Sequence, residues 1–183
     1  MKILKLTTVL LLNCAIVAGV LGAVNAITEE RIALQKAEKA RKAYESVLKA
    51  DTYEALEFNG DAFSGVTDIV RADDKGYVVR LTFSGAQGSI TMAVGVDTEY
   101  KCTGISIIEH SETSGLGANA AAASEVGRNF RAQFVGQDES VALSNKGGDI
   151  DALTGATITT DAIVEAVAEA IAVAKSAEGG TAA

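Results

Sequence analysis

The stretch GYVVRLTFSGAQGSITMAVGVD, residues 76–97, contains two runs of β-branched and apolar residues separated by a short segment with two glycines. Runs of this kind, bounded by Gly, Asp or Asn, are typical of β-strands joined by tight connections. Similar runs lie on either side, GVTDIVRA at 65–72 and CTGISIIEH at 102–110. Their spacing of roughly ten to twelve residues predicts an antiparallel meander. Strands are expected near 64–71, 77–84, 89–96 and 102–109.

Helical periodicity follows the predicted sheet, first in the segment 117–138, where one side carries Val126, Phe130 and Phe134. A last helix is predicted from about residue 160 to about residue 175. Its apolar stripe holds Ile163, Val167, Ala170, Ile171 and Ala174, and its opposite edge holds Asp161, Glu165 and Glu169. Because the acids recur on every turn, this helix is amphipathic and does not span a membrane. The predicted fold class is therefore α+β, with a mostly antiparallel sheet and flanking helices.

The N-terminal segment contains the longest apolar run, since the nineteen residues from Leu6 to Val24 carry no charge. A helix of that length spans about 28 Å, close to the thickness of the hydrocarbon core of a bilayer. Lysines precede the run and glutamates follow it, so the positive-inside rule predicts a cytoplasmic N-terminus and an extracytoplasmic domain. The tripeptide at 24–26 also permits a cleaved signal peptide. The run is longer than a typical signal h-region, which favours an uncleaved anchor in contact with lipid through residues 6–24.

Four segments are predicted along the chain. Residues 1–27 form a transmembrane anchor, and residues 28–50 form a charged membrane-proximal helix that Thr28 could cap. Residues 51–176 form one domain, and residues 177–183 form a disordered tail.

Composition excludes several kinds of function. The net charge of −8 argues against a nucleic-acid partner, because phosphates need cationic residues to neutralise them. The two cysteines, Cys14 and Cys102, form no CxxC motif, and His110 is the single histidine. We therefore expect no metal site, and no catalytic residues of a hydrolase type.

The first motif is EHSETSGLGANA, residues 109–120, between the last predicted strand and the following helix. Glu112 and Thr113 offer polar groups, and Leu116 is an apolar residue between Gly115 and Gly117. The glycines allow the backbone to approach a ligand closely. By itself, however, the motif is also compatible with an ordinary strand-to-helix loop.

The second motif is DALTGAT, residues 151–157, directly before the last predicted helix. Thr159 or Thr160 could cap that helix. The same helix end is also an anion site, since its free N–H groups and the helix dipole both attract a phosphate. A threonine hydroxyl at this point could carry a phosphate ester. Lys146 could neutralise that phosphate, or it could be an ordinary exposed lysine.

The second motif resembles the flavinylation motif of proteins that carry FMN linked through its phosphate to a threonine. The resemblance places the phosphoester on Thr157. It implies that Thr154, Gly155 and Ala156 shape the acceptor loop and that Asp151 serves recognition by a flavin transferase.

The first motif resembles the same family in its His-x-Glu-Thr-x-Gly-Leu-Gly form, with Ser114 where the family usually has Pro. It implies that Glu112, Thr113, Leu116 and Gly117 line the isoalloxazine, with Leu116 against a ring face. His110 is either a flavin contact or a hydrogen-bonded loop residue. Residues 1–175 as a whole resemble the G subunit of the Rnf complex, an ion-translocating ferredoxin:NAD+ oxidoreductase. The C subunit of the Na+-translocating NADH:quinone reductase belongs to a related family.

This resemblance implies an electron-transfer subunit of a membrane-bound translocase, without a complete active site of its own. Its implied partners are the other flavin- and iron–sulfur-carrying Rnf subunits and, during maturation, the flavin transferase. The implied location is the cell membrane, with the FMN domain on the extracytoplasmic or periplasmic side. The alternatives are an anchored covalent flavoprotein outside Rnf and a non-redox domain whose threonines only cap a helix.

Overall fold

The computed structural model describes residues 2–56, 63 and 65–179. The chain divides into two compact units, Met1–Lys39 and Ala40–Ala183. The predicted strands and the last two predicted helices all fall in the second unit.

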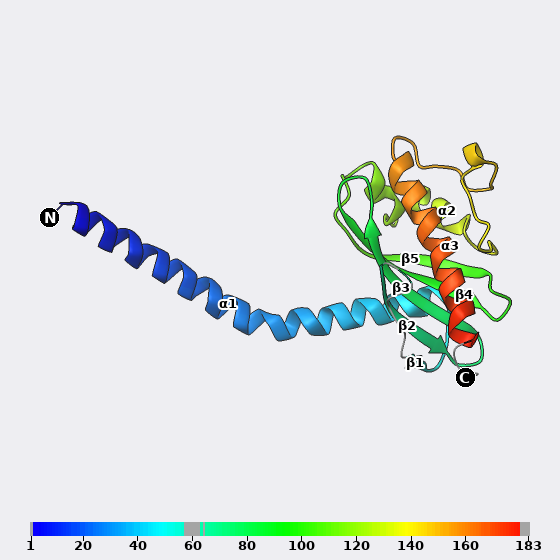
Figure 1. Cartoon of the computed structure of the whole chain (residues 1–183), viewed down its shortest axis with the longest axis horizontal. Helices are drawn as coiled ribbons and strands as arrows, with labels where there is room; N and C mark the ends of the chain where they lie inside the picture. Colours follow the sequence, from blue (N-terminus) through cyan, green and yellow to red (C-terminus); the bar gives the residue numbers. More distant parts are fainter. Residues whose placement is uncertain (1, 57–62, 64, 180–183) are drawn as a thin grey trace. The chain divides into compact units, whose positions relative to one another are not determined.

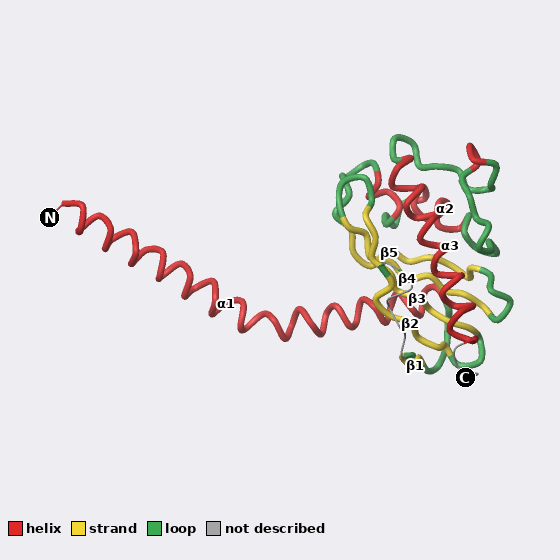
Figure 2. Tube along the Cα trace, in the orientation of Figure 1, coloured by secondary structure: helices red, strands yellow, loops and turns green. Residues whose placement is uncertain are grey.

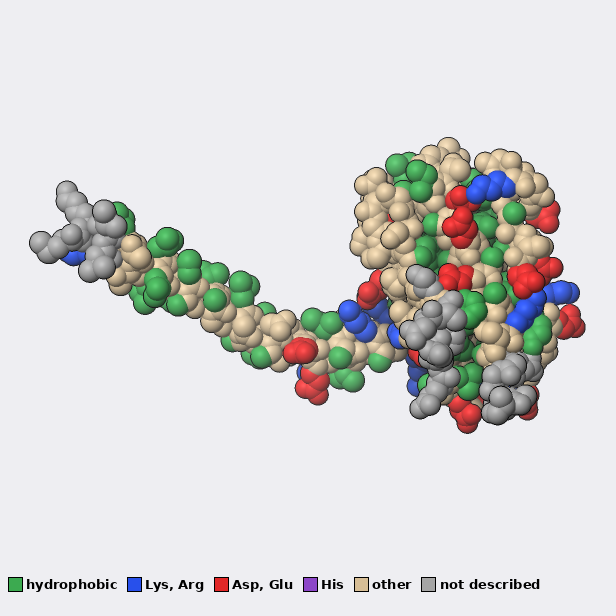
Figure 3. Space-filling view, viewed as in Figure 1, with side chains coloured by type: hydrophobic (Ala, Val, Ile, Leu, Met, Phe, Trp, Pro, Cys, Tyr) green, Lys and Arg blue, Asp and Glu red, His purple; other side chains and the backbone are tan. Residues whose placement is uncertain are grey.

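The first unit is formed by the long helix α1 (Lys2–Val47) as far as Lys39. The last turns of α1, from Ala40 onward, belong to the second unit. The described part of α1 is long and apolar enough to cross a membrane, and its apolar window has no buried residues. Figure 3 shows apolar side chains along this segment. The helix continues through Thr28, whose hydroxyl donates a 2.9 Å hydrogen bond to the carbonyl of Val24. The expected cap at Thr28 is therefore wrong, because the hydroxyl bonds to the preceding turn of an uninterrupted helix.

The second unit contains a five-stranded antiparallel sheet in which each strand pairs with its neighbour in sequence. Figures 1 and 2 show this meander. Its strands are β1 (Tyr53–Ala55), β2 (Val66–Ala72), β3 (Gly76–Ser84), β4 (Ser89–Asp97) and β5 (Cys102–His110). The four predicted strands are confirmed, with bounds that differ by two residues at most. The short strand β1 was not expected.

Helix α3 (Thr157–Gly179) covers one face of the sheet. Every residue of the predicted apolar stripe is buried, whereas Glu165 on the opposite edge is exposed. The amphipathic pattern is therefore confirmed. Burial raises the pKa of Glu169, which lies on the half-buried part of that edge. The tail expected at 177–183 is helical as far as Gly179, and residues 180–183 lie outside the described residues.

The segment after β5 is not one continuous helix as expected. It forms a 3-10 helix, η2 (Gly117–Ala120), and then α2 (Glu125–Ala132). The hydroxyl of Ser124 accepts a hydrogen bond from the N–H of Gly127 and caps α2, which explains the new start. Phe130 and Phe134 are buried in an edge-on pair with centroids 5.3 Å apart. Val126, expected beside them, is instead 56% exposed.

The last turns of α1 cover the other face of the sheet. Ala40, Ala43, Tyr44 and Val47 are buried with side chains of β2, β3 and β4 that alternate with those facing α3. Gly95 of β4, which pairs with Gly104 of β5, makes room for the helix end. A Cβ on Gly95 would lie 2.7 Å from the carbonyl oxygen of Val47. The Thr103 hydroxyl donates a 2.5 Å hydrogen bond to that same oxygen.

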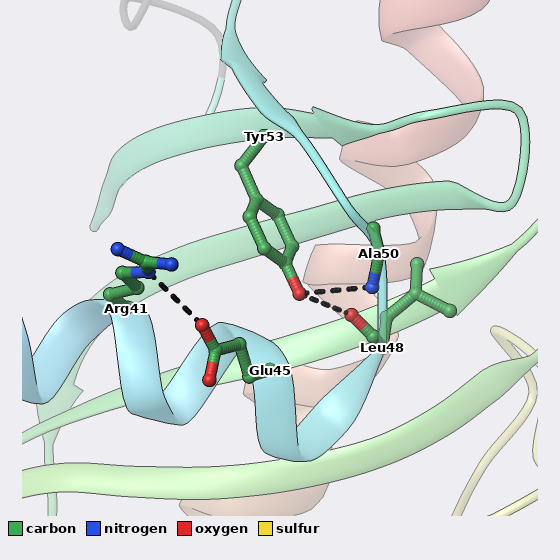
Figure 4. Close-up of polar contacts among 5 residues, drawn as sticks. All are labelled: Arg41, Glu45, Leu48, Ala50 and Tyr53. Carbon is green, nitrogen blue, oxygen red and sulfur yellow. Dashed lines mark hydrogen bonds and ion pairs between the residues drawn. The ribbon is translucent and has the colours of Figure 1, made fainter.

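Tyr53 stabilises the segment that connects α1 to β1. Its hydroxyl donates to the carbonyl of Leu48 at 2.8 Å and accepts from the N–H of Ala50 at 3.2 Å. Figure 4 shows this arrangement together with the 3.0 Å ion pair between Arg41 and Glu45 one turn earlier. The end of α1 is thus held to the sheet by polar as well as apolar contacts.

Candidate functional site

The two sequence motifs meet at a cavity of about 410 Å³ near the N-terminus of α3. Three segments that are distant in sequence line it: the turn between β3 and β4, the loop after β5, and the start of α3. The lining residues are Ala86, Gln87, Glu112, Thr113, Leu116, Gly117, Gly155, Ala156, Thr157, Ile158 and Thr159. The volume lies within the range of about 300–1,000 Å³ found for small-molecule sites.

Glu112 is only 9% exposed, and its hydrogen bonds join the three segments. One carboxylate oxygen accepts a 2.8 Å hydrogen bond from the hydroxyl of Thr159, and the other accepts a 3.1 Å bond from the N–H of Gln87. Glycines on both sides leave space for this carboxylate. A Cβ on Gly85 would clash with one of its oxygens, and a Cβ on Gly117 would clash with the other. Glycine is therefore required at Gly85 and Gly117 because the Glu112 carboxylate approaches them closely.

The Glu112 carboxylate is ionised at neutral pH. Burial raises the pKa of Glu112, but hydrogen bonds from the Gln87 N–H, the Thr159 hydroxyl and neighbouring N–H groups of the β3–β4 turn outweigh that effect. The net result is a pKa below the ordinary value, since these donors stabilise the charged form.

Helix α3 begins about three residues earlier than expected, at Thr157. The N–H of Thr160 makes the first helical bond, at 2.9 Å to the carbonyl of Ala156. The hydroxyl of Thr160 donates to that same carbonyl and accepts from the N–H of Leu153. The prediction that Thr159 or Thr160 caps the helix is therefore wrong, because both lie inside its first turn and their hydroxyls bond elsewhere.

Ala156 occupies the cap position and has no side-chain acceptor for the first N–H groups of α3. Such groups lack partners within a helix. Thr157 follows as the first helical residue, exposed and part of the cavity lining. The arrangement can therefore hold an anion beside the Thr157 hydroxyl.

Apolar side chains from the first motif and from the start of α3 flank the cavity. Leu116 is 44% exposed and Ile158 is 70% exposed. Gly155, with φ of +74°, brings the second motif close to the first, and a Cβ there would lie 3.1 Å from Leu116. Ile158 was not expected at the site. Its signal in the sequence is an isoleucine near the start of α3 that falls outside the buried stripe.

The remaining expected residues lie outside the cavity lining. Thr154 and Asp151 are exposed, and the N–H of Asp151 donates to the side chain of Gln133 at 2.7 Å. His110 is the exposed last residue of β5. Lys146 forms a 2.7 Å ion pair with Asp161 in the early part of α3.

The described residues contain no group of three His, Cys, Asp or Glu side chains that could hold a metal ion. Cys102 is buried in the core, and burial raises the pKa of its thiol to about 12. Its thiol is therefore protonated at physiological pH and does not serve as a nucleophile.

Comparison with known proteins addresses this same region. Residues 85–172 match the family model of the FMN-binding domain. The chain is 31% identical to the G subunit of the ion-translocating oxidoreductase complex of Methanosarcina acetivorans, with 97% of each chain covered. The chain belongs to the G-subunit family of ion-translocating oxidoreductase complexes. It is also 33% identical to the G subunit of the proton-translocating ferredoxin:NAD(+) oxidoreductase complex of Clostridium ljungdahlii, over 93% of this chain and 90% of that one.

A solved structure with some similarity to this G-subunit family member is that of the C subunit of the Na(+)-translocating NADH-quinone reductase from Parabacteroides distasonis. The TM-score is 0.47 and the sequence identity is 22%, over 73% of this chain and 79% of that one.

Proposed function

We propose that this chain transfers electrons as the G subunit of an Rnf complex and carries FMN through a phosphoester on Thr157. The observation that carries this proposal is the cavity that contains Thr157, Glu112 and Leu116 together, although the two motifs lie forty residues apart. Membership of the G-subunit family and the match to the FMN-binding domain support the cofactor and the complex.

The lining of the cavity fits FMN. Leu116 and Ile158 provide exposed apolar surface for a flat aromatic ring. The start of α3 provides N–H groups and a helix dipole for the phosphate. When bound, FMN supplies the redox chemistry, and the protein holds and orients it.

The charge of the lining favours a covalent bond to the phosphate. Among the described residues, the cavity lining includes no Lys or Arg, and the nearby Lys146 is already paired with Asp161. A free FMN phosphate would therefore meet only the partial positive charge of the helix start, and the ionised Glu112 would oppose that attraction. An ester to Thr157 retains the cofactor without requiring tight binding of the phosphate.

Attachment requires an activated flavin nucleotide. The Thr157 oxygen would form a bond to the flavin phosphorus and give its proton to a base of the transferase, while the bond from that phosphorus to the second phosphate breaks. A donor in which the phosphate is part of a diphosphate provides that leaving group, and a flavin transferase would catalyse the exchange. Asp151 and Thr154, exposed outside the cavity, remain accessible for recognition by such an enzyme.

The apolar part of α1 supports anchoring in the membrane. Lys2 and Lys5 precede this part and Glu29 and Glu30 follow it, which favours a cytoplasmic N-terminus and an extracytoplasmic domain. The anchor would keep the flavin near the flavin- and iron–sulfur-carrying subunits with which it exchanges electrons.

Flavin fluorescence of the denatured full-length protein, expressed in its native host, tests the covalent attachment. A fluorescent band after denaturing electrophoresis, with an intact mass increased by one FMN ester, is expected. The Thr157→Ala variant should lose both signals, whereas Thr157→Ser should retain them because it keeps a hydroxyl. A dark wild-type band would contradict covalent flavin, and label that persists in Thr157→Ala would mean that another residue carries it. Co-purification with the other membrane subunits tests the assignment to the complex.

A further inference from the structure

Glu112 lines the cavity, where it is predicted to contact the flavin, and its carboxylate also binds two other segments of the protein. Both carboxylate oxygens accept hydrogen bonds, one from the α3 residue Thr159 and one from the β3–β4 turn. The N–H groups of Ala86 and Gly88 are also among the donors that lower the pKa of Glu112, so protein donors surround a carboxylate that has about four acceptor sites. The geometry therefore gives Glu112 a role in addition to the expected contact with the ring.

The bond to Thr159 fixes the rotation of the first turn of α3. Thr159 is 1% exposed and its hydroxyl lies 2.8 Å from the Glu112 carboxylate, so this side chain faces inward. Successive side chains of an α-helix are rotated by about 100° around its axis, so side chains two positions apart differ by about 200°. Thr157 consequently projects from the other side of the helix start, where it is exposed.

The other oxygen of Glu112 fixes the opposite wall of the cavity. The N–H of Gln87 binds it, and the turn that carries Gln87 is closed by a 2.8 Å bond from the N–H of Gly85 to the carbonyl of Gly88. One buried carboxylate thus sets the distance between this turn and the start of α3. No apolar residue in the same place would bind both donors.

We propose that Glu112 is a positioning residue for flavin attachment, which acts through Thr159 to present the Thr157 hydroxyl at the mouth of the cavity. This inference rests on the proposed function, since it concerns the same hydroxyl. It differs from a flavin contact in that Glu112 acts before the cofactor is present.

The rate of flavin attachment in the full-length protein tests this role. The transferase is induced in cells that already contain the unlabelled chain, and the fluorescence of the denatured band is followed over time. Glu112→Gln is expected to slow labelling by about tenfold to a hundredfold, because a misplacement of roughly 1 Å costs on the order of a hundredfold in rate. The control Glu109→Gln removes an exposed carboxylate at the end of β5 and should label at the wild-type rate.

Thr159 variants separate positioning from a general structural role. Thr159→Val should slow labelling as Glu112→Gln does, and the double variant should be no slower than the slower single variant, because the two changes share the Glu112–Thr159 hydrogen bond. Thr159→Ser retains the hydroxyl and should restore labelling. Amide hydrogen exchange of the unlabelled proteins should increase at residues 157–160 in both slow variants, while the buried part of α3 at 163–174 keeps its protection.

Two results would overturn the proposal. Wild-type labelling rates in Glu112→Gln would contradict a positioning role and leave covalent attachment to Thr157 intact. If Glu112→Gln lost protection throughout α3, Thr159→Val would decide, and a normal rate in that folded variant would also contradict the proposal. Absence of label in the wild-type protein would instead overturn the proposed function, and the Glu112 proposal with it.

Discussion

Two carboxylates accept a hydroxyl hydrogen bond on opposite sides of the same sheet. Glu112 accepts from Thr159 of α3, and Asp68 of β2 accepts from Tyr44 of α1 at 3.0 Å. Asp68 also lies 3.5 Å from Arg80, its oppositely charged neighbour on β3. Glu112 instead binds uncharged donors and lines a cavity.

The difference indicates what each carboxylate does. Asp68 fastens the end of a helix to the sheet, and its charge is compensated by Arg80. The pKa of Tyr44 is raised, first by burial and then by the charge of Asp68, so the hydroxyl keeps the proton that it donates. Glu112 holds its charge beside open space, where a cofactor would experience it. The contacts of Asp68 are therefore structural, whereas the contacts of Glu112 shape a site.

The largest expected loss of stability comes from adding a Cβ beside the hydrogen-bonded side chains of Glu112 and Thr159. Gly117→Ala places a Cβ against the Glu112 carboxylate and 2.8 Å from the Thr159 hydroxyl, so the cluster must open. We expect a loss of about 3 kcal/mol in the free energy of unfolding, together with slow flavin labelling. Denaturant titration and in-gel fluorescence measure the two effects. The matched control is Gly104→Ala on the opposite face, where the nearest contact is an ordinary 3.6 Å, and equal losses in both variants would contradict the comparison.

Glu112→Gln is expected to destabilise the unlabelled protein by about 2 kcal/mol at neutral pH, the range for hydrogen bonds to charged groups. The folded-state pKa of Glu112 is lowered, so its contribution is present above the ordinary value of 4.5 and is lost as the pH falls through the folded-state pKa. The difference between wild type and variant should therefore shrink below about pH 4.5. Denaturant titrations at several pH values measure it, and a difference that grows on acidification would mean the charged form is not the stabilising one.

Tyr44→Phe removes the hydroxyl that Asp68 accepts. We expect a loss of about 1 kcal/mol in stability, typical of one hydrogen bond, and an unchanged rate of flavin labelling. Thermal unfolding and in-gel fluorescence provide the two measurements. Slow labelling in this variant would show that the two faces of the sheet are not independent.

The smallest effect is expected for Arg41→Ala. Its ion pair with Glu45 joins exposed side chains one helical turn apart, and pairs of this kind contribute about 0.3–0.5 kcal/mol. High salt should remove most of this difference. A loss above about 1 kcal/mol would indicate that Arg41 contributes more than a surface ion pair.

The sheet was predictable because its signal is local. Alternating β-branched residues define β2 to β5, whereas β1 is the tripeptide Tyr53–Ala55 and acquires its strand form by pairing with β2. The buried stripe of α3 was predictable from its period, but its start was not. Threonine favours helix caps locally, but Thr159 and Thr160 lie inside the helix, where Thr159 bonds to the distant Glu112 and Thr160 bonds to the preceding loop.

The candidate site was only partly predictable. The two motifs identify Thr157, Leu116 and Gly117, which the cavity brings together. Ala86 and Gln87 were not expected, because their place depends on the folding of the β3–β4 turn over the loop after β5. The bond between Glu112 and Thr159 joins residues 47 positions apart, a contact that no local pattern encodes.

That 47-residue separation has a consequence for biosynthesis. If Glu112 presents the acceptor hydroxyl, an unfolded chain lacks the acceptor geometry even though it contains the complete DALTGAT sequence. Modification would then act as a checkpoint of conformation, since strand β5, its loop and α3 must have assembled first. Molecules that bear the flavin would be those that had already folded.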